Sequence, residues 1–304
     1  MKNKVKTTLI LVSFIFIFSL SFFSVTFTVG GSNSNFNTIK EAVASARDGD
    51  TIFIFPGIYE ENLRFQKSLS IVGKERDRVI IKAKTSKSPA ILVENSKSVV
   101  IESITIETEG IAISFAMSNA VIRNNMIKTS SDGIRGGTLN HSTDVIGNTI
   151  IGPLNYEYSS SKGNSNGIVL FGQGKTNINN NQVRGFETGI FITGKRPCYI
   201  NKNIFSFNNV AMYSGGYTIA EMNENVFSDN FLDGIIIGDK TELTMIKNSF
   251  LSNKNWDIRF SGKNCETGVN IDFTGKVYGE SNKMDELSRI CPEDYDWPES
   301  FFID

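Results

Sequence analysis

A six-residue string with a fixed asparagine returns six times between residues 122 and 250. Its copies begin at residues 122, 145, 178, 200, 222 and 245 and read IRNNMI, VIGNTI, INNNQV, INKNIF, MNENVF and MIKNSF. The asparagines are Asn125, Asn148, Asn181, Asn203, Asn225 and Asn248, so the steps are 23, 33, 22, 22 and 23 residues. A period near 22 with alternating polarity, β-branched and aromatic residues and no helical spacing is typical of one coil of a parallel β-solenoid.

One insertion interrupts this repeat. A second repeated element follows each asparagine and consists of a small residue or an aspartate and then isoleucine or methionine. This element begins 8 or 9 residues after five of the asparagines but 19 residues after Asn148. The long offset coincides with the single 33-residue step. We therefore place an insertion of about ten residues between Ile150 and Gly167.

Equivalent residues of successive coils stack, because parallel coils repeat about every 4.8 Å along the axis. The apolar residues two positions after each asparagine are predicted to form one inward row. This row is Ile127, Ile150, Val183, Phe205, Phe227 and Phe250. The asparagines themselves are expected to form an internal ladder, in which each amide bonds to its neighbour and to the turn backbone and the residue tolerates left-handed geometry.

The open ends of a solenoid expose core residues and backbone groups, so they need caps. Four apolar residues with helical spacing predict a short amphipathic helix over residues 38–47. They are Ile39, Ala42, Val43 and Ala46. The chain is then expected to turn into a strand at 51–55, and the acidic and aromatic tail from about Gly262 is the candidate cap of the other end.

These patterns predict an all-β fold, a right-handed parallel β-helix of about eight to ten coils with a short N-terminal capping helix. The β-helix is expected to occupy residues 31–261, including less regular coils between residues 51 and 95. Residues 262–304 are then a C-terminal cap or extension.

The segment from Phe36 to Gly73 contains the strings TIKEAV, GDTIFIFPGIYEE and SLSIVG and resembles the first coils of the pectate-lyase-like β-helix superfamily. The asparagine repeats resemble those of its carbohydrate-binding and sugar-hydrolase repeat group. This resemblance covers residues 36–261 and implies a right-handed β-helix with a polysaccharide as partner. Members place their chemistry in unrelated ways, and the complete catalytic motifs of the pectin methylesterases, polygalacturonases and common pectate lyases are absent from this sequence.

The start of the chain reads as a targeting segment. Three lysines within the first six residues precede a mostly apolar run from about Leu9 to Val29. A cleavable apolar region has about 7–15 residues, whereas a membrane-spanning helix has roughly 20, so residues 1–30 are predicted to be either a signal peptide or a membrane anchor. Both alternatives predict export, to the periplasm, the cell surface or the medium, with membrane contact only through an uncleaved segment.

Charge and cysteine content limit the partners. The 31 basic and 32 acidic residues give a formal net charge of −1, which excludes the strong positive field that nucleic-acid binding needs. Cys265 and Cys291 in the C-terminal part are the disulfide candidates, and three buried free thiols are the alternative. With one histidine and scattered cysteines, we predict no zinc or copper site and identify no cofactor. Calcium stays open, because acidic residues of adjacent coils can converge without a linear motif.

One outward row is the first candidate site. It consists of the residues that follow the inward isoleucine or methionine of each coil: Arg135, Val169, Phe191, Tyr213, Ile236 and Arg259. An apolar stripe with central aromatics and an arginine at each end can stack sugar rings and bind carboxylates. The predicted carbohydrate-binding residues are Arg135, Phe191, Tyr213 and Arg259, together with Tyr156 and Tyr158 of the insertion. Two alternatives stay open: the insertion covers the stripe, or two molecules pack there as a homo-oligomer.

A second candidate site lies on the coil before the insertion, where Asp132, Arg135, His141 and Asp144 come close in sequence. A polysaccharide lyase or a uronate epimerase needs a cation beside the carboxylate and a base for the C5 proton, and arginine with histidine or tyrosine supplies both. The alternative is that His141 is a solvated turn residue.

Three hypotheses of function follow, in this order. The first is an exported β-helix that binds a polysaccharide, most simply an acidic one. The second is a polysaccharide lyase or epimerase that also processes it. The third is a structural or adhesive surface solenoid without catalysis.

Overall fold

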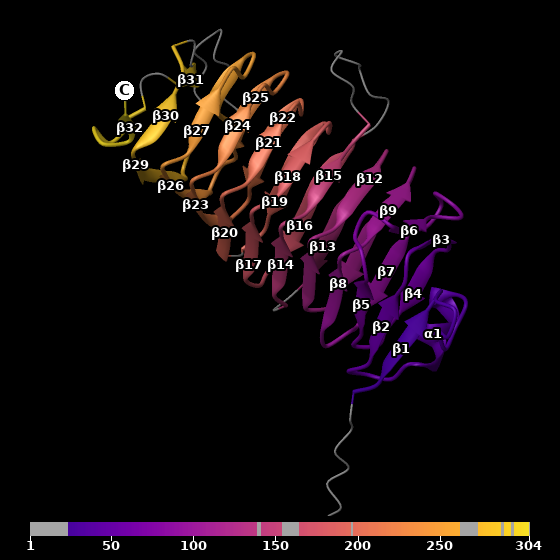
Figure 1. Ribbon diagram of the computed structural model, residues 1–304. Coiled ribbons are helices and arrows are strands. Elements are labelled where there is room, and N and C mark those ends of the chain that lie inside the picture. Colours follow the sequence, from indigo (N-terminus) through magenta and orange to yellow (C-terminus); the bar gives the residue numbers. More distant parts are fainter. Residues whose placement is uncertain are drawn as a thin grey trace, which may run out of the picture.

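The computed structural model describes residues 24–138, 141–153, 164–195, 197–261, 273–286, 289–292 and 295–303. In this part of the chain, strands wind into a parallel β-solenoid of about 11 turns, with three sheets along its length and one short helix at its N-terminal end (Figure 1). Each coil passes from sheet A to sheet B and then to sheet C. The predicted right-handed parallel β-helix is confirmed, while the predicted count of eight to ten coils is too low.

The strands of each sheet pair in parallel with the coils before and after them. Sheet A contains β1 (Thr26–Val29), β2 (Thr51–Ile54), β5 (Ser70–Gly73), β8 (Val99–Glu102), β11 (Ala120–Arg123), β14 (Thr143–Ile146), β17 (Thr176–Asn179), β20 (Pro197–Asn201), β23 (Ile219–Asn223), β26 (Glu242–Ile246) and β29 (Lys276–Glu280). Sheet B contains β3 (Gly57–Glu60), β6 (Val79–Lys82), β9 (Thr105–Thr108), β12 (Met126–Thr129), β15 (Thr149–Ile151), β18 (Gln182–Arg184), β21 (Ile204–Ser206), β24 (Val226–Ser228), β27 (Ser249–Leu251), β30 (Asn282–Met284) and β32 (Phe302–Ile303). Sheet C contains β4 (Leu63–Phe65), β7 (Ile91–Glu94), β10 (Ile113–Ala116), β13 (Ile134–Thr138), β16 (Asn166–Gly172), β19 (Thr188–Thr193), β22 (Val210–Gly215), β25 (Asp233–Ile237), β28 (Trp256–Phe260) and β31 (Ile290–Cys291).

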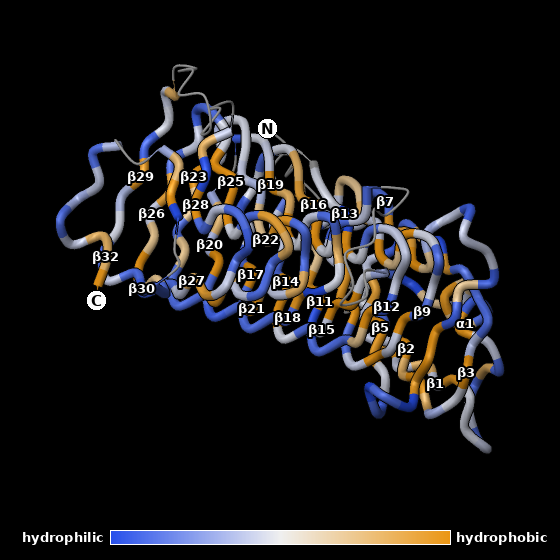
Figure 2. The backbone as a smooth tube through the Cα atoms, turned by 90° about the horizontal axis from the view of Figure 1, so that it is seen from above, coloured by the Kyte–Doolittle hydropathy of each residue, from blue (hydrophilic) through white to orange (hydrophobic). Residues whose placement is uncertain are grey.

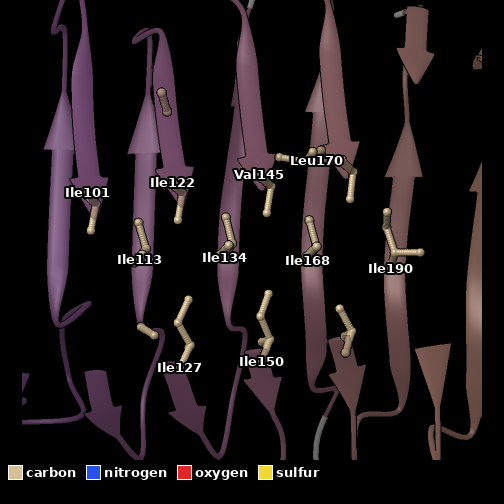
Figure 3. Close-up of a cluster of buried hydrophobic side chains, with 14 of the residues drawn as sticks. Ile101, Ile113, Ile122, Ile127, Ile134, Val145, Ile150, Ile168, Leu170 and Ile190 are labelled. Atoms are coloured by element: carbon tan, nitrogen blue, oxygen red, sulfur yellow. The ribbon is translucent and has the colours of Figure 1, made fainter. Parts of the chain in front are cut away.

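The core consists of columns of identical or similar side chains, one column for each inward strand position. On sheet C, Ile113, Ile134, Ile168 and Ile190 form such a column and are fully buried (Figure 3). The inward row predicted from the repeat lies on sheet B and is confirmed, with every member at most 1% exposed. Hydrophobic residues recur at equivalent places along the molecule (Figure 2). Coil-to-coil stacking is therefore the packing rule of the whole core.

The predicted asparagine ladder is confirmed and runs between sheets A and B. The side-chain oxygen of Asn148 accepts hydrogen bonds from the backbone nitrogen and the amide nitrogen of Asn125, both at 3.0 Å. The Asn125 amide also donates to the carbonyl oxygen of Ile101 at 2.9 Å. The same pattern continues through every repeat asparagine to Asn282, which the repeat had not included. Each rung is buried, so these bonds form in a low-dielectric interior.

Left-handed backbone geometry occurs one residue earlier than predicted. It belongs to the residue before each ladder asparagine, for example to Lys202 (φ 56°) and Glu224 (φ 55°). This residue turns the chain from sheet A into sheet B, and the following asparagine then points inward. A second ladder, of Asn208, Asn230 and Asn253, repeats the arrangement between sheets B and C.

The N-terminal cap is confirmed as α1 (Ile39–Ser45), which begins with a capping box between Thr38 and Glu41. Both helix ends are also held by charges of the first coil. The Glu61 carboxylate accepts hydrogen bonds from two backbone nitrogens of the first turn, at 2.9 and 2.8 Å. The Lys67 ammonium donates to three carbonyl oxygens at the other end, at 2.6–2.8 Å. These signs match the helix dipole.

The β-helix extends beyond both predicted boundaries. Strand β1 pairs with β2 along four residues, and Val29 is fully buried, so residues 26–29 belong to the β-helix and not to a separate segment 1–30. After residue 261 the chain adds further strands to all three sheets, and an aromatic cluster that includes Phe273, Trp297 and Phe301 closes that end. These additions account for the higher coil count. No helix in the described ranges is long and apolar enough to cross a membrane, and residues 1–23 lie outside them.

Replacing Asn203 by alanine is expected to lower the free energy of unfolding by about 2–4 kcal/mol, because it leaves several buried ladder groups without partners. Asn201→Ala is the matched control, since Asn201 bonds to its neighbours only on the outer, partly buried side of sheet A. Its loss is expected to be about 1 kcal/mol or less. Urea unfolding of both variants checks this, and equal losses would contradict a special role for the inner ladder.

A chain that begins at Gly31 is expected to be less stable than one that begins at Ser24. The shorter chain lacks β1, which exposes the edge of β2 and removes the buried Val29 side chain, a loss of about 2 kcal/mol or more. It also removes the backbone donor of Val25 from the Asp50 carboxylate. Thermal unfolding followed by circular dichroism compares the two chains, and identical midpoints would show that β1 contributes nothing.

Candidate functional site

The six residues of the predicted outward stripe do form one continuous row on the outer face of sheet C. Arg135 is opposite Val169, which is opposite Phe191, and the register continues through Tyr213 and Ile236 to Arg259. We call these six residues the outer row. Five of them are half-buried, but Ile236 is only 8% exposed, so the expectation of a fully exposed stripe needs correction. Ile236 lies between the larger side chains of Tyr213 and Arg259, which explains its burial.

The two central aromatic rings lie face to face along the solenoid axis. The ring centroids of Phe191 and Tyr213 are 5.0 Å apart with an angle of 6° between the ring planes, and parallel rings this close must overlap. Val169 and Ile236 are the next residues of the row on either side of this pair. A sugar therefore meets ring edges and the Tyr213 hydroxyl, and not the open ring faces that the sequence analysis expected. Gly215 leaves the space into which the Tyr213 ring leans, 2.8 Å from where a β-carbon would be.

Each arginine at the end of the outer row is held by a buried aspartate. Arg135 donates from Nε (2.6 Å) and from Nη2 to Oδ2 of Asp132, whose side chain is fully buried. Arg259 donates from Nε (2.8 Å) and Nη2 (2.7 Å) to Oδ2 of Asp233, whose side chain is 3% exposed. The arginine side chains are themselves 44% and 29% exposed. Each guanidinium group is thus held by a buried carboxylate, while its side chain stays partly exposed to solvent.

The two aspartates differ in their second oxygen. Oδ1 of Asp132 accepts hydrogen bonds from the backbone nitrogen and the amide of Asn166, at 3.0 and 2.9 Å. Oδ1 of Asp233 is buried and has no hydrogen-bond partner among the described residues. Asp233 was missed by the sequence analysis, although the signal was present: Asp132 and Asp233 both begin the string Asp-Gly-Ile at equivalent positions of the repeat.

The predicted catalytic residues are divided between sheet C of one coil and sheet A of the next. Asp132 and Arg135 are brought together on sheet C. Asp132 is buried and accepts four hydrogen bonds, two from Arg135 and two from Asn166, so it holds these neighbours in place. His141 lies on the turn toward sheet A, where its backbone packs against Gly174. Asp144 lies on the outer side of sheet A and accepts a hydrogen bond from Asn177 at 2.5 Å. A catalytic role for this set stays a prediction.

Several predicted residues fall outside the described ranges, namely Tyr156 and Tyr158 of the insertion and Cys265. Cys291 is disulfide-bonded. Its predicted pairing with Cys265 remains a prediction.

Comparisons with known proteins agree on the fold. The chain resembles a crystal structure of the pectate lyase Pel9A, with a TM-score of 0.62, 14% identity, and coverage of 94% of this chain and 80% of that one. It also resembles a complex of XylC with xylose (TM-score 0.53, 11% identity, 90% and 85% coverage) and an alginate lyase from Paenibacillus sp. str. FPU-7 (0.51, 10%, 92% and 99%). No curated protein gives a significant match. The chain therefore shares the right-handed parallel β-helix fold with these structures.

A narrower resemblance concerns the second half of the chain. The model of the family described as periplasmic copper-binding protein (NosD) matches residues 155–283, which is less than half of the 304 residues.

The described residues do not fit a copper site of the usual soft-ligand kind. They contain no group of three or more His, Cys, Asp and Glu side chains that could hold a metal ion. Met222 and Met245 are opposite each other on sheet A, but both are fully buried in the core column. Soft-metal sites need clustered, accessible Cys, Met or His ligands. We therefore derive no function through copper.

Asp132→Asn is expected to destabilise the protein more than Asp233→Asn, by about 2 kcal/mol, although both aspartates hold an arginine. At position 132 both oxygens accept hydrogen bonds, so an amide nitrogen necessarily faces a donor. At position 233 the amide nitrogen can take the place of the unpartnered oxygen while the amide oxygen keeps Arg259. Urea unfolding of the two variants measures the difference. Equal losses would mean that the unpartnered oxygen has no energetic consequence.

Proposed function

We propose that this chain is an exported β-helix protein that binds an acidic polysaccharide along the outer row of sheet C. The observation that carries this proposal is the composition of the row, which places an apolar and aromatic surface between two fixed, partly exposed guanidinium groups. Sugar rings present apolar C–H groups and hydroxyls, and uronates add carboxylates. The row offers a matching partner for each of these groups.

The polar part of the proposal depends on the arginines. Arginine binds carboxylates through paired N–H groups, which gives direction as well as charge. Two buried carboxylates hold these side chains in place, so less side-chain entropy is lost when a ligand binds. The Tyr213 hydroxyl adds a hydrogen-bonding group at the centre of the row.

Two comparisons support the ligand class and the location. The structural neighbours include proteins named as a pectate lyase and an alginate lyase, and pectate and alginate are acidic polysaccharides. The family that matches residues 155–283 is described as periplasmic, in agreement with the export predicted from the lysines and the apolar run near the start of the chain.

Tyr213→Ala is expected to lower the affinity for polygalacturonate or alginate at least tenfold, because it removes the central ring and its hydroxyl from the outer row. Tyr278→Ala is the matched control, since Tyr278 is 51% exposed but lies on sheet A. Affinity electrophoresis in gels that contain each polysaccharide measures the retardation. Equal retardation of both variants would reject the outer row as the binding face.

The same preparations distinguish binding from processing. A lyase produces unsaturated sugars that absorb in the ultraviolet, and an epimerase changes the uronate composition seen by NMR. If the wild type forms product and Arg135→Ala or His141→Ala does not, the protein is better described as a polysaccharide lyase or epimerase than as a binding protein. A protein that neither binds nor processes any polysaccharide in the panel would instead support a structural solenoid.

A further inference from the structure

The two arginines of the outer row are separated by a fixed number of coils. Five register steps lead from Arg135 to Arg259. Because parallel coils rise by about 4.8 Å each, the two side chains are about 24 Å apart along the axis. Both belong to the same rigid sheet, so this separation does not adjust to the ligand.

The four residues between the arginines carry no charge. Val169, Phe191, Tyr213 and Ile236 form a surface on which a carboxylate has no cationic partner within the row. Any ion pairs that a polyuronate makes with the row are therefore confined to its two ends.

Each end is built to receive an anion. A guanidinium has five N–H donors, and the aspartate beneath uses Nε and Nη2 of each arginine. The remaining N–H groups belong to the terminal nitrogens, the part of the side chain that pairs with a carboxylate. The aspartates are almost fully buried, so they fix the arginines without competing for solvent-side contacts.

We infer that Arg135 and Arg259 form a two-point clamp that selects linear polyuronates by length. The inference rests on the proposed function and adds to it a minimum ligand size. One pyranose unit of an extended chain advances about as far as one coil, so about six units are needed to reach both arginines. Shorter chains engage one arginine at a time, and longer chains gain the second contact as an intramolecular step.

The test is isothermal titration calorimetry with oligogalacturonates of graded length, from about three to about ten units. The proteins are the wild type, Arg135→Gln, Arg259→Gln and the double variant. Arg135→Lys and Arg259→Lys provide a second set, because lysine keeps a charge beside the buried aspartate but loses the paired N–H groups. Arg184→Gln, an exposed arginine on sheet B, is the matched control. Circular dichroism melting verifies that each variant is folded.

In the wild type and in Arg184→Gln, affinity is expected to rise at least tenfold between about five and seven units. In each single variant the step is expected to disappear, while the affinity for trimers changes by no more than about twofold, since either arginine can serve a short chain. A smooth increase with length in the wild type, or a step that survives in Arg135→Gln, overturns the clamp alone. If no oligogalacturonate of any length binds, the proposed function fails and the clamp with it.

Discussion

The hydrogen bond from one buried asparagine to the next is the interaction on which the rest of the structure depends. Each ladder amide satisfies a backbone N–H and a backbone carbonyl of the preceding coil, for example those of Asn181 and Ile178 around Asn203. The turn from sheet A to sheet B would otherwise bury these groups without partners, which costs about 1–3 kcal/mol for each group. The ladder therefore fixes where every coil turns, and with it the phase of the strands that follow.

This common register places residues that are far apart in the sequence side by side on one face of sheet C. Arg135 and Arg259 are 124 positions apart in the sequence, yet they lie in one row because every coil between them keeps the register. The insertion after β15 does not disturb this register, because β13 pairs directly with β16 across it. The step between paired residues grows from 22 at Phe205 and Phe227 to 23 at Val210 and Asp233, so this coil has one extra residue. The turn between sheets B and C accommodates it without a change of register in the sheets. Variation is thus confined to turns, and the sheets supply a constant frame.

The repeat was sufficient to predict which residues share a row and which rows face inward, and the helical spacing of apolar residues between Ile39 and Ala46 predicted the N-terminal helix. It did not predict how side chains within a row orient. The face-to-face contact of Phe191 and Tyr213 depends on the space above Gly215, and the pairing of Arg259 with Asp233 joins two coils through side-chain conformation. The boundaries were misplaced for a different reason. The residues of β1 overlap an apolar run typical of targeting segments, and the last coils lack the regular spacing of the repeat.

Because coils stack through one repeated ladder, the length of the molecule changes only in whole coils. Loss of a few residues from a strand would break the alignment of the ladder asparagines between coils. Duplication or deletion of a complete coil would keep this alignment, with one coil more or one coil fewer. Any feature measured along the axis, including the distance between two side chains of one column, is therefore quantised in units of about 4.8 Å. Evolution can lengthen or shorten such a surface by recombination of coils while its cross-section stays the same.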